Sequence, residues 1–154
     1  MKRFLMKTLP LLVLMSGSAL AQSIEVDTLE SRPTSIGSPD LFTGQPVIDP
    51  LFAETDYSSV TAGVVTFPPG ARAAWHTHPA GQILVVTSGV GWVQTRGEER
   101  QEIRAGDVVR IPPDIEHWHG ASAENSMTHI AIQEAVDGSA ADWLSHVTDD
   151  EYAE

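Results

Sequence analysis

The sequence has no cysteine among its 154 residues and only two lysines, Lys2 and Lys7. Without cysteine the chain forms no disulfide and has no thiolate nucleophile. Both lysines fall in the first seven residues, so a chain that has lost this segment also lacks the amine needed for Schiff-base catalysis. Stability must then come from packing, a metal or assembly.

Residues 1–21 are predicted to be a secretory signal peptide. A positively charged start precedes an apolar run at 9–14, and Ala19-Leu20-Ala21 fits a small-x-small cleavage site. The apolar run is too short to span a bilayer. We therefore expect cleavage after Ala21 and export to the periplasm or the exterior, and an uncleaved anchor is the alternative.

The chain that would remain, residues 22–154, is strongly acidic. It carries six arginines against 21 acidic residues, a formal charge of −15 with histidine neutral. Such a charge repels phosphate backbones and anionic lipid surfaces. We therefore expect neither a nucleic-acid partner nor a membrane partner after signal removal.

The order of turn-forming and β-forming segments along the sequence predicts an all-β domain with extensions at both ends. Residues 22–59 are rich in turn formers and predict an extended arm, in which VIDPLF at 47–52 adds an edge strand. Residues 60–136 contain short β-branched and aromatic runs separated by turns, which is typical of a sandwich or barrel. Residues 137–154 are predicted to hold one short helix and a tail, with Ser139 as N-cap of a capping box. Arg72 and the arginines from 96 to 110 are interpreted as solvated charges.

Histidines are scarce, yet four of the six occur in two His-x-His pairs. These are His76 with His78 and His117 with His119. Residues two apart on a strand share a face, so each pair points one way. In the run MTHIAIQE, His129 shares a face with Gln133. Imidazoles inside a small barrel are costly unless a partner satisfies them.

A divalent metal would satisfy such a cluster best, because neutral imidazole is the commonest metal ligand. We predict that His76, His78 and His117 are ligands and that Gln82, just past a tight turn, is the fourth. The alternatives are core histidines with internal partners and a polar residue at a strand end. His119 and His129 are predicted to be pocket residues, and the alternatives are that they support the metal ligands from behind or are simple core histidines.

The spacing of these residues resembles the two motifs of the cupin superfamily. Gly70-x5-His76-x-His78-x3-Gln82-x6-Gly89 is similar to the first motif, in which glutamate usually stands at Gln82. Gly106-x5-Pro112-x-Asp114-x2-His117 is similar to the second, in which glycine usually stands at Asp114. The resemblance implies a cupin β-barrel, a double-stranded jelly roll.

A narrower resemblance covers nearly all of residues 22–154. VIDPLF, PGARAAWHTHPAGQ, HWHG and DW-x-x-HVTD resemble the small manganese-dependent cupin hydroxynitrile lyases of bacteria. This resemblance implies a homodimer, a small-molecule cyanohydrin substrate such as mandelonitrile, and Mn²⁺ on His76, His78, Gln82 and His117. Iron, nickel and zinc are alternatives for the metal.

The ligand set suits Lewis-acid chemistry because it is neutral and leaves the metal its full charge. We interpret His129 as the general base that faces the pocket, with His119 and Gln133 steering the leaving cyanide. A dioxygenase-type cupin acting on a small aromatic substrate is one alternative. A non-catalytic binding module stabilised by its metal is the other.

Overall fold

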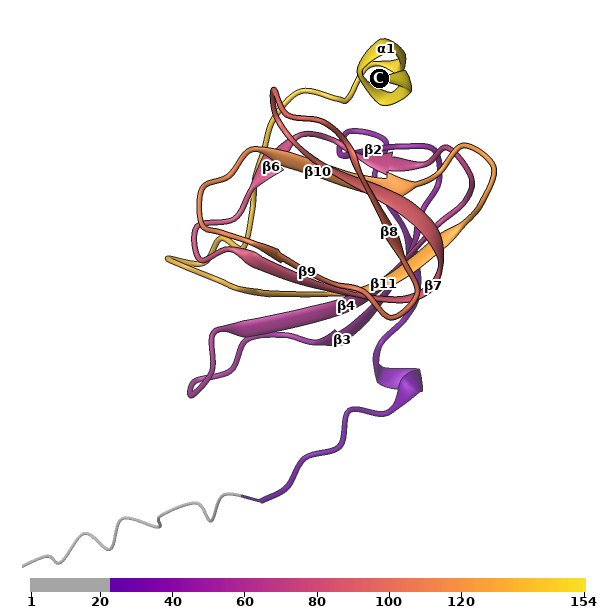
Figure 1. Cartoon of the computed structure of the whole chain (residues 1–154). Coiled ribbons are helices and arrows are strands. Elements are labelled where there is room, and N and C mark those ends of the chain that lie inside the picture. The colour runs from indigo at the N-terminus through magenta and orange to yellow at the C-terminus, as the bar shows by residue number, and fades with distance from the viewer. Residues whose placement is uncertain (1–22) are drawn as a thin grey trace, which may run out of the picture.

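The computed structural model describes residues 23–154, so the predicted signal peptide at 1–21 lies outside the described residues. Two antiparallel sheets face each other and close into a barrel (Figure 1). One sheet contains β1 (Ser35–Ile36), β3 (Val47–Phe52), β4 (Val60–Phe67), β9 (Val108–Ile111), β11 (Met127–Glu134) and the first part of β7 (Gln82–Thr95). The other contains β2 (Phe42–Thr43), β5 (Arg72–Ala73), β6 (His76–Thr77), β8 (Gln101–Arg104), β10 (His117–Ala121), β12 (Asp142–Trp143) and the rest of β7. The predicted all-β jelly roll is confirmed.

Strand β7 belongs to both sheets because it bends along its length. Its first part pairs with β9 and β11, and its second part pairs with β8 and β10. The bend includes Gly89, whose φ of +76° is left-handed and where a Cβ would overlap the carbonyl oxygen of Ser126. Only glycine fits both conditions, so Gly89 lets a single strand turn the corner of the barrel.

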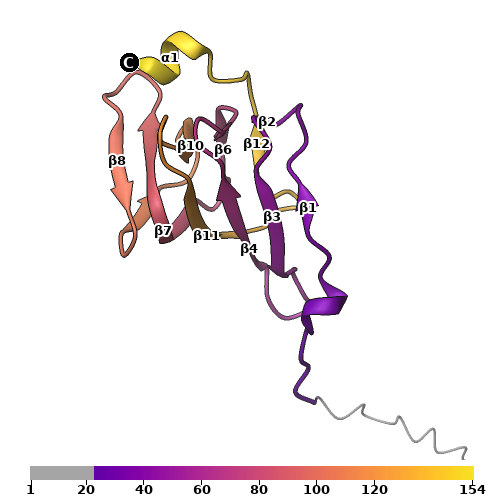
Figure 2. The same cartoon turned by 90° about the vertical axis from the view of Figure 1, so that its right-hand side faces the viewer.

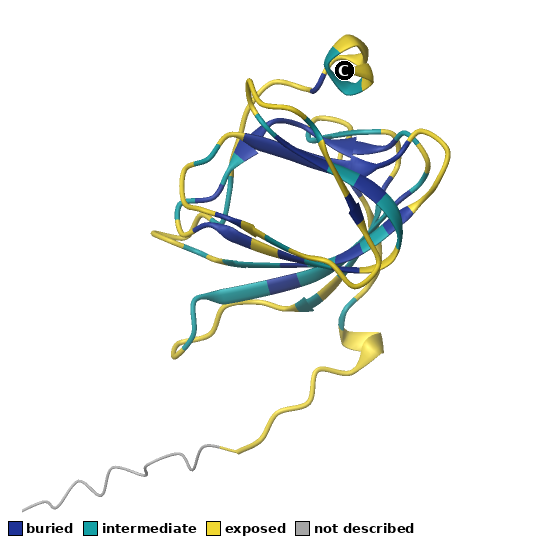
Figure 3. Ribbon diagram, viewed as in Figure 1, coloured by how far each residue is buried: buried dark blue, intermediate teal, exposed yellow. Residues whose placement is uncertain are grey.

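The core lies between the two sheets. Phe67, Leu84 and Met127 are fully buried within it and pack with apolar residues of both sheets. Alternate residues of β11 are buried, starting with Met127 and His129, and the residues between them are half-buried. Figure 3 shows buried positions concentrated on the strands around the barrel, whereas the segment before β1 is exposed. The face of β11 that carries Met127 and His129 therefore points into the barrel.

A second cluster packs the C-terminal segment against the outside of the barrel. Trp75, Trp118 and Val147 are buried there, and Tyr152 of the terminal helix packs against them. Arg72 is also buried, contrary to the prediction that it is a solvated charge. Its guanidinium donates to the Val147 carbonyl oxygen at 3.0 Å, pairs with Asp149 at 2.7 Å and covers the Tyr152 ring. These partners compensate a charge whose burial would otherwise be costly.

The short C-terminal helix exists, but the prediction that Ser139 caps it was wrong. The helix is α1 (Asp149–Ala153), and Thr148 and Glu151 form its capping box. Residues 142–143, expected inside the helix, form β12 and pair with β6. The sequence contains two capping-box patterns, and tertiary pairing of the first segment overrides its local helix signal. Figure 2 shows β12 beside β2 and α1 at the far end of the C-terminal segment.

The N-terminal segment adds strands beyond the one expected. VIDPLF forms β3, but β3 is not the edge of its sheet, because the two-residue strand β1 pairs along its outer side. A 3₁₀ turn, η1 (Leu29–Ser31), precedes β1. Within residues 23–154, no helix has the length and apolar character needed to cross a membrane.

Candidate metal centre

Pairing of two strands brings the two histidine motifs together. β6 pairs with β10 so that His76 lies opposite His117, and the ring centroids are 4.2 Å apart. His78 follows at the end of β6, and its ring centroid is 5.0 Å from that of His76 and 5.5 Å from that of His117. All three side chains are buried. The predicted convergence of these three histidines is therefore seen in the fold.

The hydrogen bonds of these rings leave one nitrogen of each ring free. The Nδ1–H groups of His76, His78 and His117 donate to backbone carbonyl oxygens at 2.8, 2.6 and 2.8 Å, those of Ala74, Ala140 and Ile115. These bonds fix the tautomer, because a carbonyl oxygen can only accept. Each Nε2 then carries a bare lone pair, as a metal ligand requires.

Burial keeps these rings neutral. Desolvation lowers the pKa of His117 to about 4, and that of His76 lies well below its ordinary value for the same reason. Desolvation also lowers the pKa of His78, opposed by its bond to Ala140. Protons therefore do not compete for the lone pairs near neutral pH.

Gln82 presents an oxygen to the same point. It opens β7 directly after Gly81, which turns with a φ of +79°. The amide nitrogen of Gln82 donates to Gln133 Oε1 at 3.3 Å, and its Oε1 lies 3.4 Å from His117 Nε2. With Nδ1 of His117 donating elsewhere, two lone pairs face each other across this gap. Two acceptors repel unless a cation lies between them, so this arrangement fits a metal.

His119 and His129 form a buried pair beside the ligand cluster. His129 Nε2 lies 3.2 Å from His119 Nδ1. A nitrogen atom of His119 also lies within 4.8 Å of nitrogens of His76 and His117, which the sequence did not indicate. His119 lines the cavity but His129 does not, contrary to the expectation that His129 faces the pocket. His129 instead lies behind His119, with no exposed surface.

Unpaired nitrogens mark the cluster as a site. Among residues 23–154, buried side-chain nitrogens without a hydrogen-bond partner include His78 Nε2, His119 Nε2 and His129 Nδ1. Buried polar atoms rarely lack a partner, and an absent ion is one explanation. Three imidazoles and one amide oxygen are a donor set that divalent transition metals accept. The residues present therefore fit a metal.

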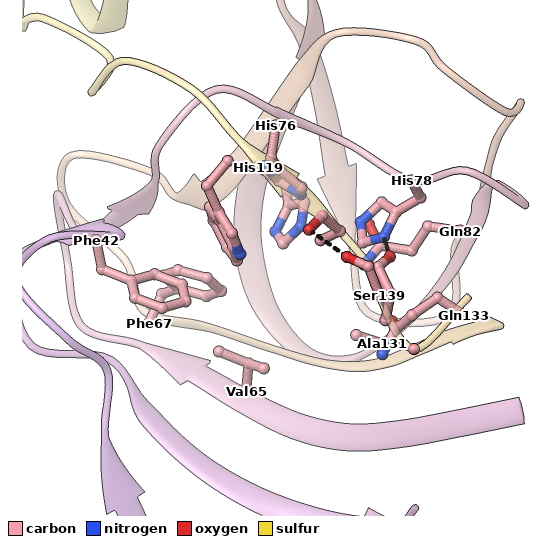
Figure 4. A pocket seen from close by; sticks show the side chains of 14 residues that line it. Phe42, Val65, Phe67, His76, His78, Gln82, His119, Ala131, Gln133 and Ser139 are labelled. Carbon is pink, nitrogen blue, oxygen red and sulfur yellow. Dashed lines mark hydrogen bonds between the residues drawn. The ribbon is translucent and has the colours of Figure 1, made fainter. Parts of the chain in front are cut away.

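Three of the four predicted ligands, His76, His78 and Gln82, line one side of a cavity of about 410 Å³, whereas His117 borders a neighbouring cavity instead. Figure 4 shows Phe42, Phe67 and Val65 on one side, facing His78 and Gln82 on the other. Residues 138–141, Trp143, Ala131 and Gln133 also line it. The cavity therefore joins an apolar wall to a polar wall, as in sites for small organic ligands.

Asp114 stands at the position where the second cupin motif usually has glycine. Its φ is +61°, in the left-handed region, and its N–H donates to the His78 carbonyl oxygen at 3.0 Å. Aspartate tolerates this conformation better than most residues. The turn before His117 is therefore kept with aspartate in place of glycine.

Similarity to known proteins agrees with this fold. A family model described as "Cupin domain" matches residues 63–132. The (R)-mandelonitrile lyase of Granulicella tundricola is 51% identical over 129 residues, which are 84% of this chain and 98% of that protein. The chain therefore belongs to the cupin family. Within that family, it is similar to the (R)-mandelonitrile lyase over almost the whole of that relative.

Solved structures show the same architecture. A cupin-like protein from Thermotoga maritima is 43% identical, with a TM-score of 0.74, and the match covers 82% of this chain and 95% of that one. A cupin-2 domain protein from Rhodospirillum rubrum is 14% identical, with a TM-score of 0.63 and 84% of both chains covered. The second likeness supports the fold alone.

The sequence did not reveal the aromatic residues of the cavity. Trp143 is a partly exposed cavity residue that stacks on the His76 ring. Phe42 comes from the segment interpreted as an arm. Neither residue lies in a histidine motif, and both reach the site through pairing of short strands that have no periodic signal.

Proposed function

We propose that this protein is a metal-dependent hydroxynitrile lyase, which cleaves a cyanohydrin to an aldehyde and hydrogen cyanide and catalyses the reverse addition. The observation that carries the proposal is the set of neutral donor atoms converging beside the cavity, with three bare Nε2 atoms and an amide oxygen. The relative with 51% identity, named for mandelonitrile cleavage, supports the choice of substrate class.

His76, His78, His117 and Gln82 would hold the metal, for which we propose Mn²⁺, with Fe²⁺, Ni²⁺ and Zn²⁺ as alternatives. A bound divalent ion supplies Lewis acidity, which lowers the pKa of a hydroxyl group beside it. These four ligands would add no negative charge, so they would leave the charge of the ion uncompensated. Replacement of Gln82 by glutamate would reduce the net positive charge at the metal.

The pair of His119 and His129 is assigned the proton transfer. Burial lowers the pKa of His129 to about 4 and holds that of His119 well below its ordinary value. Both rings are therefore neutral near pH 7, and His119 Nε2 has no partner at the cavity wall. His119 takes the proton of the substrate hydroxyl while His129, 3.2 Å behind it, stabilises the positive charge. The pair then returns the proton to the departing cyanide.

Gln133 holds a supporting position. Its Oε1 accepts from Gln82, and its amide nitrogen donates to Thr61 Oγ1 at 2.8 Å. The amide has a second N–H, and Gln133 lines the cavity, so this group is available to steer cyanide. The apolar wall of Phe42, Phe67 and Val65 is suited to the aryl group of an aromatic cyanohydrin.

Alanine variants of the three histidine ligands test the proposal. His76→Ala, His78→Ala and His117→Ala should each lose most of the bound metal and most mandelonitrile cleavage. His146→Ala is the matched control, because His146 is exposed and does not line the cavity. A full complement of metal in all three variants would refute the site. Oxygen uptake with a phenolic substrate, without cleavage, would favour a dioxygenase.

We also propose that the chain is exported and forms a homodimer. The support for export is the sequence pattern at 1–21, and the support for a dimer is the exposed apolar arm, with Ile24 95% and Val26 79% exposed. The N-terminal sequence of protein from its native host should begin at Gln22. Light scattering should give twice the chain mass, whereas a monomer at micromolar concentration would contradict the dimer.

A further inference from the structure

Residues 138–143, which we call the strap, cover one side of the cavity although they belong to neither histidine motif. Residues 138–141 and Trp143 line the cavity. The carbonyl oxygen of Ala140 accepts the Nδ1–H of His78 at 2.6 Å. The strap therefore contacts one predicted metal ligand directly.

The strap also holds an indole against a second predicted ligand. β12 pairs with β6 so that Trp143 lies opposite His76. Backbone bonds beside this pair fix its register, from Leu144 N to Trp75 O at 2.8 Å and from Trp75 N to Ser145 O at 3.0 Å. The Trp143 ring stacks on the His76 imidazole, with centroids 4.7 Å apart and an interplanar angle of 27°. This packing restricts rotation of the His76 ring.

Stacking has a chemical consequence when His76 binds a cation. Donation of the Nε2 lone pair leaves the imidazole electron-poor, and an electron-rich indole attracts an electron-poor ring or a cation more strongly. The interaction between the Trp143 and His76 rings is therefore more favourable when His76 binds a metal than when it does not. Loss of a hydrogen-bonding partner that orients a metal ligand changes metal affinity by about 10- to 100-fold, and we expect a stacked ring that orients His76 to act at the lower end of that range.

Trp143 faces a second aromatic ring across the cavity edge. Its centroid is 5.5 Å from that of Phe42, at an interplanar angle of 62°. Trp143 is 37% exposed and is absent from both buried apolar clusters, unlike Trp75 and Trp118. Its ring is therefore available to a ligand and is not committed to the core.

We propose that Trp143 is a positioning residue for His76 and a specificity-determining residue for the aryl group of the substrate. The positioning role concerns metal affinity alone. The specificity role rests on the proposed lyase function. Both roles follow from a single ring that contacts His76 on one face and borders the cavity with Phe42.

The test compares Trp143→Ala and Trp143→Phe with Leu144→Ala. Leu144 is the next residue, is 42% exposed and does not line the cavity, so it serves as the matched control. Calorimetric titration of the metal-free proteins with Mn²⁺ should show affinity reduced about tenfold in Trp143→Ala and nearly restored in Trp143→Phe. An affinity of Trp143→Ala equal to that of Leu144→Ala would overturn the positioning role.

The specificity role is measured on the metal-loaded proteins. The kcat/KM ratio of mandelonitrile to acetone cyanohydrin should fall about tenfold in Trp143→Ala. Benzaldehyde binding, followed by calorimetry, should weaken in parallel and does not require turnover. Absence of turnover in the unmutated protein would refute the proposed lyase function, and benzaldehyde binding would still test Trp143. Unchanged benzaldehyde affinity in Trp143→Ala would overturn the specificity role.

Discussion

His129 Nε2 lies 3.2 Å from His119 Nδ1, and of these two rings only that of His119 borders the cavity. Phe67 packs against both, with centroids 5.9 and 5.6 Å away. The two histidines therefore form one acid–base unit that reaches the substrate only through His119.

Alanine substitutions should reveal this unit through non-additive effects. His129→Ala should lower mandelonitrile kcat about 100-fold at full metal occupancy, since proton transfer contributes about 10²–10⁴. Adding His119→Ala should reduce the rate little further, because residues that act together do not add. Kinetics of both single variants and the double variant provide the measurement. Multiplicative losses would show that the two rings act separately.

Gln82→Glu should separate metal binding from catalysis. Carboxylate is a good ligand for hard divalent ions, so the variant should keep its metal. The added negative charge should weaken Lewis acidity and lower the rate about tenfold, or about 1.4 kcal/mol. Metal content and mandelonitrile cleavage are measured on the same preparation. Unchanged cleavage at full occupancy would contradict the charge argument.

Acid should destabilise the metal-free protein within a defined window. Burial lowers the pKa of His117 and His129 to about 4 from an ordinary value of 6.5. The folded state then binds fewer protons than the unfolded state between these values, so stability is full above pH 6.5 and falls as the pH drops toward 4. Urea unfolding at pH 7.0, 5.5 and 4.5 checks the trend.

Manganese should shift this acid transition to lower pH, because metal and protons compete for the same Nε2 atoms. The same urea series, repeated with excess Mn²⁺, measures the shift. Identical midpoints at pH 7.0 and 4.5 without metal would show that the buried rings do not govern acid stability.

Asp114 should tolerate glycine but not valine. A left-handed φ of +61° costs a branched residue about 1–2 kcal/mol, whereas glycine adopts it freely. Asp114→Val should therefore lower the free energy of unfolding by about that amount, and Asp114→Gly should change it by less than about 1 kcal/mol. Thermal unfolding of both variants is the measurement. Equal stability of the two variants would refute the strain argument.

Much of the site could be predicted because most of its residues lie in the two His-x-His motifs. Period-two alternation placed His76 with His78 and His117 with His119 on shared faces. Only the fold could show that β6 and β10 pair, with His76 opposite His117. That pairing depends on contacts between distant segments, which local patterns do not encode.

The parts that were missed depend on tertiary packing. The Ser139 capping pattern was overridden by pairing of β12 with β6, and Arg72 found buried partners on the C-terminal segment. His119 and His129 both point inward, but only the ring of His119 borders the cavity, and His129 lies behind it. Alternation along a strand gives the face of a side chain but not its depth in the barrel.

Metal titration of the metal-free protein measures whether neutral ligands hold the ion that cleavage requires. Protein stripped by a chelator should show almost no mandelonitrile cleavage. Activity should rise in proportion to added Mn²⁺ and level off near one ion per chain, with His146→Ala behaving in the same way. Full cleavage by the stripped protein, or none after loading with any divalent metal, would contradict the account.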